Sequence, residues 1–145
     1  MIEYFNEAVD KISSAEKVLG VALQAFLVKK EKSEKVLDLH RLGVIELGVK
    51  EALSIKSDLA AMEGVAALAS GQLEAGKLSL ENASKAMAGF DLGNQFKDHH
   101  VTVSMIKSIE DEAPASVKKA EEVLALSKRL ALMCEKKDLK FVRVR

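Results

Sequence analysis

The strongest constraint on the fold is a seven-residue repeat of apolar side chains near the start of the chain. Large apolar residues recur at every seventh position, and an alanine follows each of the first three by three residues. The large residues are Phe5, Ile12, Leu19 and Phe26, and the alanines are Ala8, Ala15 and Ala22. This spacing puts them all on one face of an α-helix that packs against other helices. We therefore predict a helix over residues 2–30, whose alanines allow a neighbouring helix to come close.

The same alternation of three- and four-residue steps continues through the middle of the chain. One set comprises Ile45, Gly48, Ala52, Ile55, Leu59 and Met62, and the next comprises Ala69, Leu73, Gly76, Leu80, Ala83, Met87 and Phe90. No proline interrupts residues 34–90, and a single straight helix of that length would extend about 85 Å. We expect a compact domain to fold this segment back at Glu63-Gly64 or at Ser70-Gly71. The first is favoured because the apolar pattern continues through the second.

Three further breaks are predicted from residues that form turns or cap helices. The charged segment 29–35 is interpreted as a solvated turn, with Ser33 as the N-cap of the next helix. The segment 91–94 is the strongest break, and Asn94 would cap the helix that follows it. Pro114 suits the first turn of a last helix, which would run to about Lys137. Its inward residues would be Val117, Ala120, Leu124, Leu130 and Cys134. We therefore predict an all-α fold, with residues 1–145 forming a single domain that is an antiparallel bundle of four or five long helices.

The C-terminal segment 139–145 differs from the rest because β-branched and aromatic residues alternate there with cations. Such a pattern is typical of a short strand or an extended arm, and we find no second strand in the sequence for it to pair with. Unpaired strand edges recruit other chains. The residues of this possible interaction arm are Leu139, Phe141, Val142, Arg143, Val144 and Arg145. The arm could pair with its copy in a dimer, lie extended until a partner binds, or be a frayed chain end.

Composition narrows the classes of partner. Lys and Arg together number 22, as do Asp and Glu, whereas duplex-binding domains usually carry a basic excess that neutralises phosphates. Aromatic residues make up only 4% of the chain, which leaves few side chains on which nucleic-acid bases could stack. We therefore expect no nucleic-acid partner.

Membrane association and secretion are not expected either. The longest apolar run, Val18–Val28, is interrupted only by Gln24 and is too short to cross a bilayer, so we interpret it as a helix buried on most sides. The first residues lack the basic and apolar regions of a signal peptide. Cys134 is the only cysteine, which favours a reducing compartment. The expectation is a soluble, cytoplasmic protein.

No combination of residues predicts an enzymatic centre. His99 and His100 are adjacent, so on a helix they point about 100° apart and cannot comfortably bind one metal ion. The sequence contains no Glu-x-x-His, no His-x-x-x-His and no glycine-rich phosphate motif. We therefore predict a protein that is not an enzyme and has no cofactor, no metal site and no small-molecule substrate.

His40 lies in a segment that resembles a known family. The residues Asp38-Leu39-His40-Arg41-Leu42-Gly43 resemble the active helix of histidine phosphotransfer domains, which are helical bundles of similar size. In that family an exposed histidine is followed two residues later by a leucine, a place that Leu42 takes here. The family's lysine is absent, and Gly43 comes one residue early. The resemblance implies a signalling module that transfers phosphate through His40.

The long alanine-rich seams and the arm favour a role in protein association over an enzymatic role. We predict a non-enzymatic helical protein-association module, acting as a homo-oligomer or an adaptor, whose partner is another protein or a second copy of the chain. Phosphotransfer through His40 is the alternative.

Overall fold

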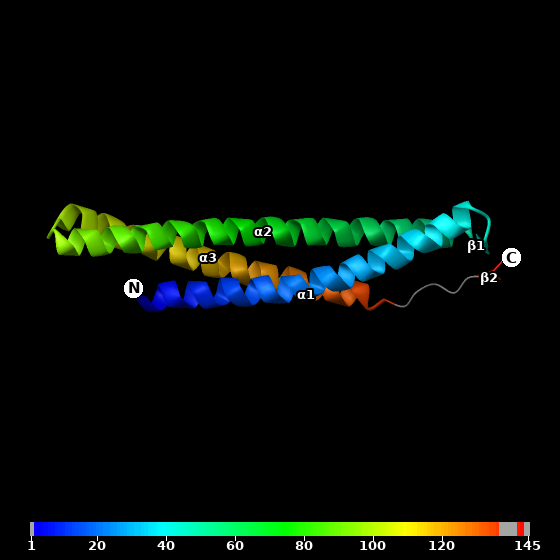
Figure 1. Ribbon diagram of the computed structural model, residues 1–145, viewed down its shortest axis with the longest axis horizontal. Coiled ribbons are helices and arrows are strands. Elements are labelled where there is room, and N and C mark those ends of the chain that lie inside the picture. The colour runs from blue at the N-terminus through cyan, green and yellow to red at the C-terminus, as the bar shows by residue number, and fades with distance from the viewer. Residues whose placement is uncertain (1, 137–141, 144–145) are drawn as a thin grey trace.

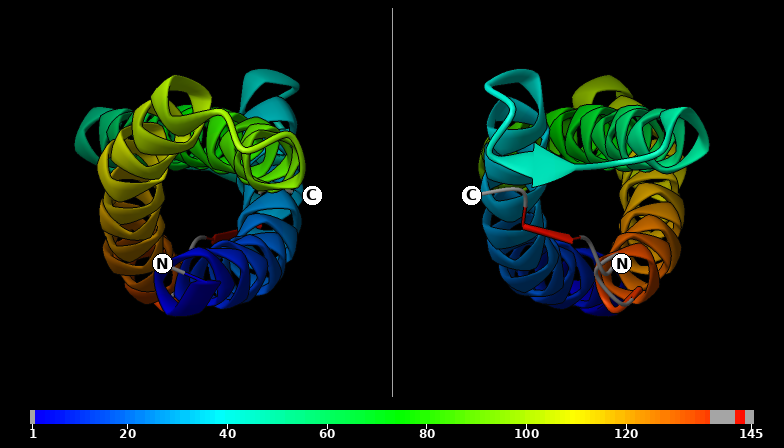
Figure 2. Two further views of the ribbon diagram at one scale, coloured as in Figure 1. Left: turned by 90° about the vertical axis from the view of Figure 1, so that its left-hand side faces the viewer. Right: turned by 90° about the vertical axis from the view of Figure 1, so that its right-hand side faces the viewer.

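Three long helices form an elongated rod in the computed structural model, which describes residues 2–136 and 142–143 (Figure 1). The helices are α1 (Ile2–Arg41), α2 (Val49–Gln95) and α3 (His99–Cys134). α1 and α3 run in the same direction, α2 runs opposite to both, and all three surround a common axis (Figures 1 and 2). Two short strands, β1 (Ile45–Glu46) and β2 (Val142–Arg143), pair antiparallel near the turn from α1 to α2. The predicted all-helical bundle is confirmed.

The predicted count of four or five helices is wrong for the described residues, because several predicted breaks lie inside helices. The charged segment 29–35 belongs to α1, and Pro114 lies within α3. Neither Gly64 nor Gly71 forms a turn, since α2 is one helix of 47 residues, which corresponds to about 70 Å. The expectation that the middle segment folds back to make a compact domain is therefore also wrong.

The continuous apolar seam explains why these local break signals fail. A glycine inside a helix costs about 0.5–1 kcal/mol and a proline about 3 kcal/mol. Ala113 and Ser116, on either side of Pro114, are both fully buried, so ending the helix there would remove them from the core. Most helical stability in proteins comes from packing and not from local propensity. Here the packing of an unbroken seam outweighs single unfavourable residues.

The turns that the structure does contain have identifiable causes. α1 ends where the chain reverses through residues 42–48, and Gly43 there has a φ of 76°, a conformation that glycine adopts without steric penalty. Ile45 and Leu47 of this turn are buried. α3 is capped by Asp98, whose side chain accepts a hydrogen bond of 3.2 Å from the Val101 N–H. The break predicted at residues 91–94 thus comes slightly later, and Asp98 caps the helix in place of Asn94.

The core extends along the rod as three clusters, and each contains residues from all three helices. The central cluster is Ile12, Ala15, Leu19, Ala69, Leu73, Ala120 and Val123. The cluster nearer the α1–α2 turn is Ala22, Phe26, Met62, Val65, Ala66 and Leu130, and the cluster nearer the α2–α3 turn is Ala8, Ala83, Ala86, Ile109 and Ala113. The predicted seam of α1 is confirmed, because its residues from Ala8 to Phe26 are buried and Phe5 is partly buried. In α2, Leu73 is buried, whereas Leu80 and Met87 are only partly so.

α2 and α3 approach each other closely at Gly76, where α2 lacks a side chain. A Cβ added to Gly76 would lie 2.7 Å from Ile12 Cδ1 and 3.1 Å from Lys119 Cβ. The Ser116 hydroxyl donates a buried hydrogen bond of 3.0 Å to the Gly76 carbonyl. Gly76 therefore lets the two backbones come near enough for a direct bond between helices.

Ion pairs on the surface link the helices in the same alignment as the core. The Lys77 ammonium lies 2.9 Å from Glu16, Lys30 lies 2.9 Å from Glu63, and Lys136 lies 2.8 Å from Asp58. The hydrogen bonds that Lys30 donates to Glu63 and Lys77 donates to Glu16 raise the pKa of each lysine above its usual value. These pairs are exposed and add little stability, but each joins residues of different helices that lie at the same level of the rod.

We expect Ala15→Leu to destabilise the protein by about 1–3 kcal/mol, because overpacking a filled core forces strained side chains and backbone shifts. Ala15 is fully buried in the central cluster. The measurement is the free energy of unfolding from urea titration, and the control is Ala125→Leu at an exposed position of α3. Equal stability of the two variants would show that this layer is loosely packed.

We expect Gly76→Ala and Gly20→Ala to change stability in opposite directions. Both glycines are inside helices, where alanine is favoured by about 1 kcal/mol. A Cβ at Gly20 meets nothing within 4 Å, whereas a Cβ at Gly76 presses on Lys119 Cβ and Ile12. Thermal unfolding should show a higher Tm for Gly20→Ala and a lower Tm for Gly76→Ala; a rise for both would contradict the close approach.

Candidate protein-association surface

A second apolar seam runs along the outside of α2. It comprises Ala61, Gly64, Leu68, Gly71, Ala75 and Leu78, which follow each other in steps of three and four residues. We call this set the outer seam of α2. Leu68 and Leu78 are 53% and 59% exposed, and nothing lies within 4 Å of a Cβ added to Gly64 or Gly71. Ala75 is partly buried and the other five residues are exposed. This face of α2 is therefore largely open to solvent among the described residues, although its periodicity is that of a packed helix.

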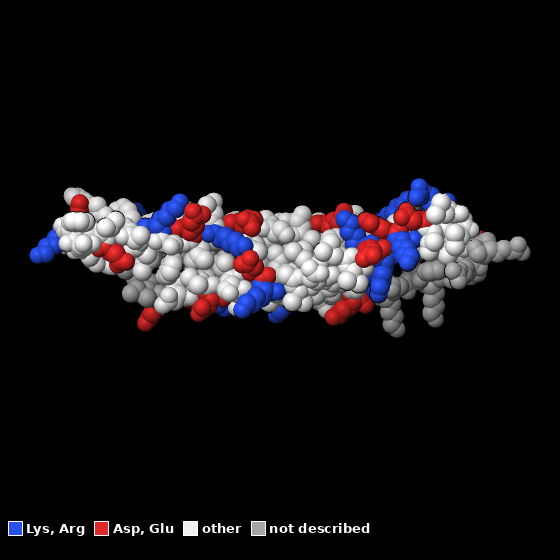
Figure 3. Space-filling model, in the orientation of Figure 1, with Lys and Arg blue, Asp and Glu red and all other residues white. Residues whose placement is uncertain are grey.

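The outer seam lies in a part of α2 that carries no charge. Residues 64–73, between Glu63 and Glu74, include no ionisable side chain. A surface helix normally places charged residues opposite its core face. Charges gather on either side of a largely white zone near the middle of the rod in Figure 3. Exposed apolar patches on proteins mark interaction sites more often than chance, so this face is a candidate site for another protein.

α1 carries a similar exposed face, formed by Val18, Val21, Ala25 and Val28. We call it the outer stripe of α1. Val21 is 73% exposed and Val28 53% exposed. These residues belong to the apolar run Val18–Val28, which was interpreted as buried on most sides. That interpretation is wrong, because only Leu19, Ala22 and Phe26 of the run are buried.

The two faces lie at the same level of the rod. Leu19 of α1 packs with Ala69 and Leu73 of α2 in one cluster, and Phe26 packs with Met62 in the next. The uncharged residues 18–28 of α1 therefore lie beside the uncharged residues 64–73 of α2. On α3 the same level contains Lys128 and Arg129. Charge is thus absent from two sides of the bundle at its centre.

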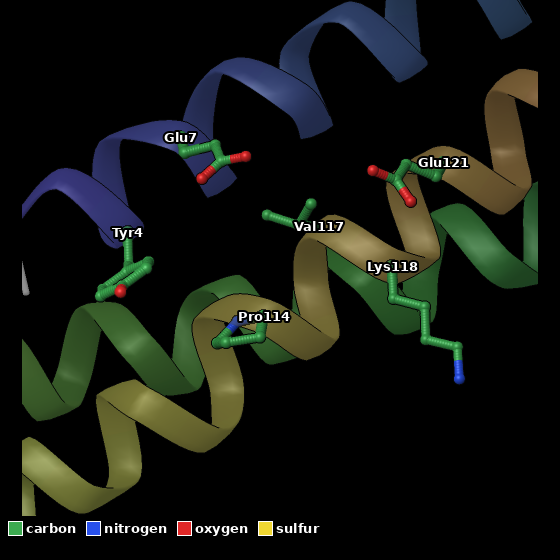
Figure 4. A pocket seen from close by; sticks show the side chains of 6 residues that line it. All are labelled: Tyr4, Glu7, Pro114, Val117, Lys118 and Glu121. Carbon is green, nitrogen blue, oxygen red and sulfur yellow. The ribbon is translucent and has the colours of Figure 1, made fainter.

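A shallow pocket lies between α1 and α3, towards the start of α1 (Figure 4). Its lining comprises Tyr4, Glu7, Pro114, Val117, Lys118 and Glu121. The carboxylates of Glu7 and Glu121 come from different helices and lie on either side of Val117, whereas Lys118 points away from them (Figure 4). Two carboxylates beside an apolar side chain suit a cationic group better than an anion. None of the six residues that line the pocket is a nucleophile paired with a base.

The predicted interaction arm is only partly described, and its described part has a partner. Val142 and Arg143 form β2, which pairs with β1 in the register Ile45↔Arg143 and Glu46↔Val142. The expectation that the chain offers no second strand is therefore wrong, since Ile45–Glu46 is that strand. It was missed because it is two residues long and lies between helical patterns. Leu139, Phe141, Val144 and Arg145 lie outside the described residues.

His40 lies in the last turn of α1 and is partly buried. Its Nδ1 atom is buried and has no hydrogen-bond partner among the described residues. The helix ends at Arg41, so Leu42 and Gly43 lie in the turn after it and not on a helix face beside the imidazole. In the sequence, His40 comes shortly before β1, the strand that pairs with β2. Phosphotransfer through His40 stays a prediction from the sequence.

Within residues 2–136 and 142–143, no group of three or more His, Cys, Asp or Glu is placed to hold a metal ion. In the same residues, none of the helices combines the length and the hydrophobicity that a membrane crossing requires.

Sequence reasoning overlooked the outer seam of α2, although the signal is present. Gly64 and Gly71 are seven residues apart, and Leu68, Ala75 and Leu78 fall at the matching positions. Gly64 and Gly71 were interpreted as turn candidates, so they were not recognised as part of a second seven-residue pattern. The absence of charge over residues 64–73 was a further signal.

Comparisons with known proteins add no family to this description. No protein-family model matches the chain, and neither curated proteins nor solved structures show a significant match to it.

Replacing both residues of β2 by proline should release β1 without unfolding the bundle. Proline has no N–H to donate to a strand partner, so Val142→Pro with Arg143→Pro removes both donors of the two-residue strand. Hydrogen exchange should become faster in peptides that contain Ile45–Glu46 and stay unchanged in peptides from the α2 core. Unchanged exchange at Ile45–Glu46 would mean that the pairing does not persist in solution.

Proposed function

We propose that the chain is a non-enzymatic protein-association module, which forms a homo-oligomer or serves as an adaptor through the outer faces of α1 and α2. The observation that carries the proposal is the pair of exposed, uncharged faces at one level of the rod. Both have the three- and four-residue spacing of helices that pack on other helices. A partner that covers them is therefore a protein with an apolar helical face.

The spacing separates these faces from ordinary surface hydrophobicity. Single exposed apolar residues are common on proteins and need no explanation. Here Val18, Val21 and Val28 line one side of α1, and Leu68 and Leu78 line one side of α2. Solvation alone gives no reason to keep charge away from an exposed helix face over ten consecutive residues, 64–73. Association with another helix gives such a reason, because an unpaired charge buried in the interface would weaken it.

The proposal is tested by the solution mass of the protein and of two charge variants. Val21→Glu and Leu68→Glu each place a carboxylate in the centre of one face. Light scattering over a range of concentrations should show wild-type species heavier than the 15.8 kDa single chain. The double variant should associate at least a hundredfold more weakly, which corresponds to about 2.8 kcal/mol.

Ser13→Glu is the matched control, since Ser13 is an exposed residue of α1 that belongs to neither face. It should keep the wild-type mass. The proposal is contradicted if two results are found together. The wild-type protein has the mass of one chain at every concentration, and the double variant binds every protein that the wild type binds. It is also contradicted if the control weakens association as much as the double variant does.

A further inference from the structure

We propose that two copies of this chain associate through the outer seam of α2, with the two α2 helices antiparallel about a two-fold axis that passes between Ala69 and Ser70. This inference rests on the proposed association function and names its partner, its face and its register. The face is accessible, because Leu68 and Leu78 are more than half exposed and a Cβ added to Gly64 or Gly71 would meet nothing within 4 Å. α1 and α3 are both below α2 in the end views (Figure 2).

The sizes of the seam residues determine the register. In an antiparallel pair, residues at equal distances on opposite sides of the two-fold axis lie opposite each other. About an axis between Ala69 and Ser70, Leu68 of one copy faces Gly71 of the other. Leu78 then faces Ala61, and Ala75 faces Gly64. Every leucine therefore meets a small residue, and the six residues of the seam pair only with one another.

Other arrangements of the same two faces pack less well. A parallel pair in register would set Leu68 against Leu68 and Gly71 against Gly71, giving crowded layers that alternate with empty ones. Interiors and interfaces pack densely, and voids forfeit dispersion contacts. An antiparallel pair shifted by one heptad towards the end of α2 would set Leu68 against Leu78, and a shift in the other direction would bring Ser54 and Ser57 into the contact. The alternation of large and small residues favours the register centred between Ala69 and Ser70.

The glycines of the seam permit the close approach that this pairing needs. A Cβ added to Gly64 or Gly71 has no neighbour within 4 Å, so the backbone itself forms the surface there. Leu68 lies about one helical turn from each glycine and is more than half exposed. A leucine of one copy can therefore reach the backbone of the other, as a knob enters a hole in packed helices. Gly76, by contrast, is already covered by Ile12 and Lys119.

The charges beside the seam are compatible with the antiparallel register. On one flank Glu74 is brought next to Ala67 of the other copy, and Glu81 next to Ala60. On the other flank Asp58 is brought next to Ser79, and Asp58 is already paired with Lys136 at 2.8 Å. No two like charges on α2 face each other along the seam. Like-charge contacts oppose association, and their absence on both flanks matches a face that meets its own copy.

Cross-linking of single-cysteine variants tests the register directly. Cys134 is first replaced by alanine, and Ala61→Cys and Leu78→Cys are made separately in that background. In the proposed dimer position 61 of one copy faces position 78 of the other, whereas two positions 61 are separated by about 25 Å along the helices. A short bifunctional maleimide should therefore link the mixture of the two variants and leave each variant alone unlinked. Efficient linking of either variant alone would overturn the antiparallel register.

Exchange of side-chain volume within one layer supplies an independent test. Gly71→Leu sets leucine against Leu68 of the other copy and should return the mass to that of one chain. Leu68→Gly combined with Gly71→Leu restores a large residue opposite a small one and should recover most of the dimer. A Gly71→Leu variant that dimerises as well as the wild type would refute the proposed contact.

The two levels of the proposal fail in different ways. If Val21→Glu dissociates the oligomer and Leu68→Glu leaves its mass unchanged, the α2 contact is wrong and the association function stands. If neither substitution changes the mass of a single-chain protein, and neither abolishes binding of any protein, both are wrong. If Leu68→Glu alone dissociates the oligomer and the mixed cysteine variants cross-link, the α2 dimer is supported.

Discussion

The close approach of three helix backbones is the constraint on which the rest of the structure depends. Alanine occupies every second layer of the α1 seam, and Ala8 and Ala15 are fully buried. At the contact of α2 with α3, Gly76 and Ser116 are near enough for a hydrogen bond from side chain to backbone. Small side chains bring helix axes together, but each buries little apolar area. A core of this kind gains its stability from length, which is why α2 runs unbroken through 47 residues.

A thin core also explains the apolar side chains on the outside. Three closely packed helices present a narrow inward face, so only part of each helix circumference is covered. Val21, Leu68 and Leu78 fall outside that face and are more than half exposed. In a bundle with a fourth helix, residues at such positions would be covered. The same close packing that forms the rod therefore leaves surfaces on α1 and α2 that a further helix can complete.

Much of the fold follows from the sequence, and the errors in the number of helices share one physical cause. The seam of α1 is predictable residue by residue, because a seven-residue repeat that recurs four times predicts a helix with those residues on its packed face. The number of helices is not, because Pro114, Gly64 and the charges of 29–35 were treated as breaks. Each is locally unfavourable or merely neutral for a helix, and the energy of an unbroken seam exceeds its cost. The pairing of β1 with β2 depends on residues about a hundred positions apart, and neither strand is long enough to show a period.

The candidate surface illustrates a more general ambiguity in helical sequences. An apolar residue every three or four positions predicts that a helix packs, but it does not say whether the neighbour belongs to the same chain. In α2 the core seam through Ala69, Leu73 and Gly76 and the outer seam through Leu68, Gly71 and Ala75 have the same seven-residue period and are offset by only one or two residues. The distribution of charge distinguishes the two cases better than hydrophobicity does. An exposed face without ionised groups has no evident benefit in a monomer, whereas a contact with another chain would explain it. The stripe on α1 satisfies the same criterion and lies on a different helix, so occupation of the α2 seam by a second copy leaves it available. The self-association and the adaptor role that we propose would therefore be compatible in one rod, because each would use a different face.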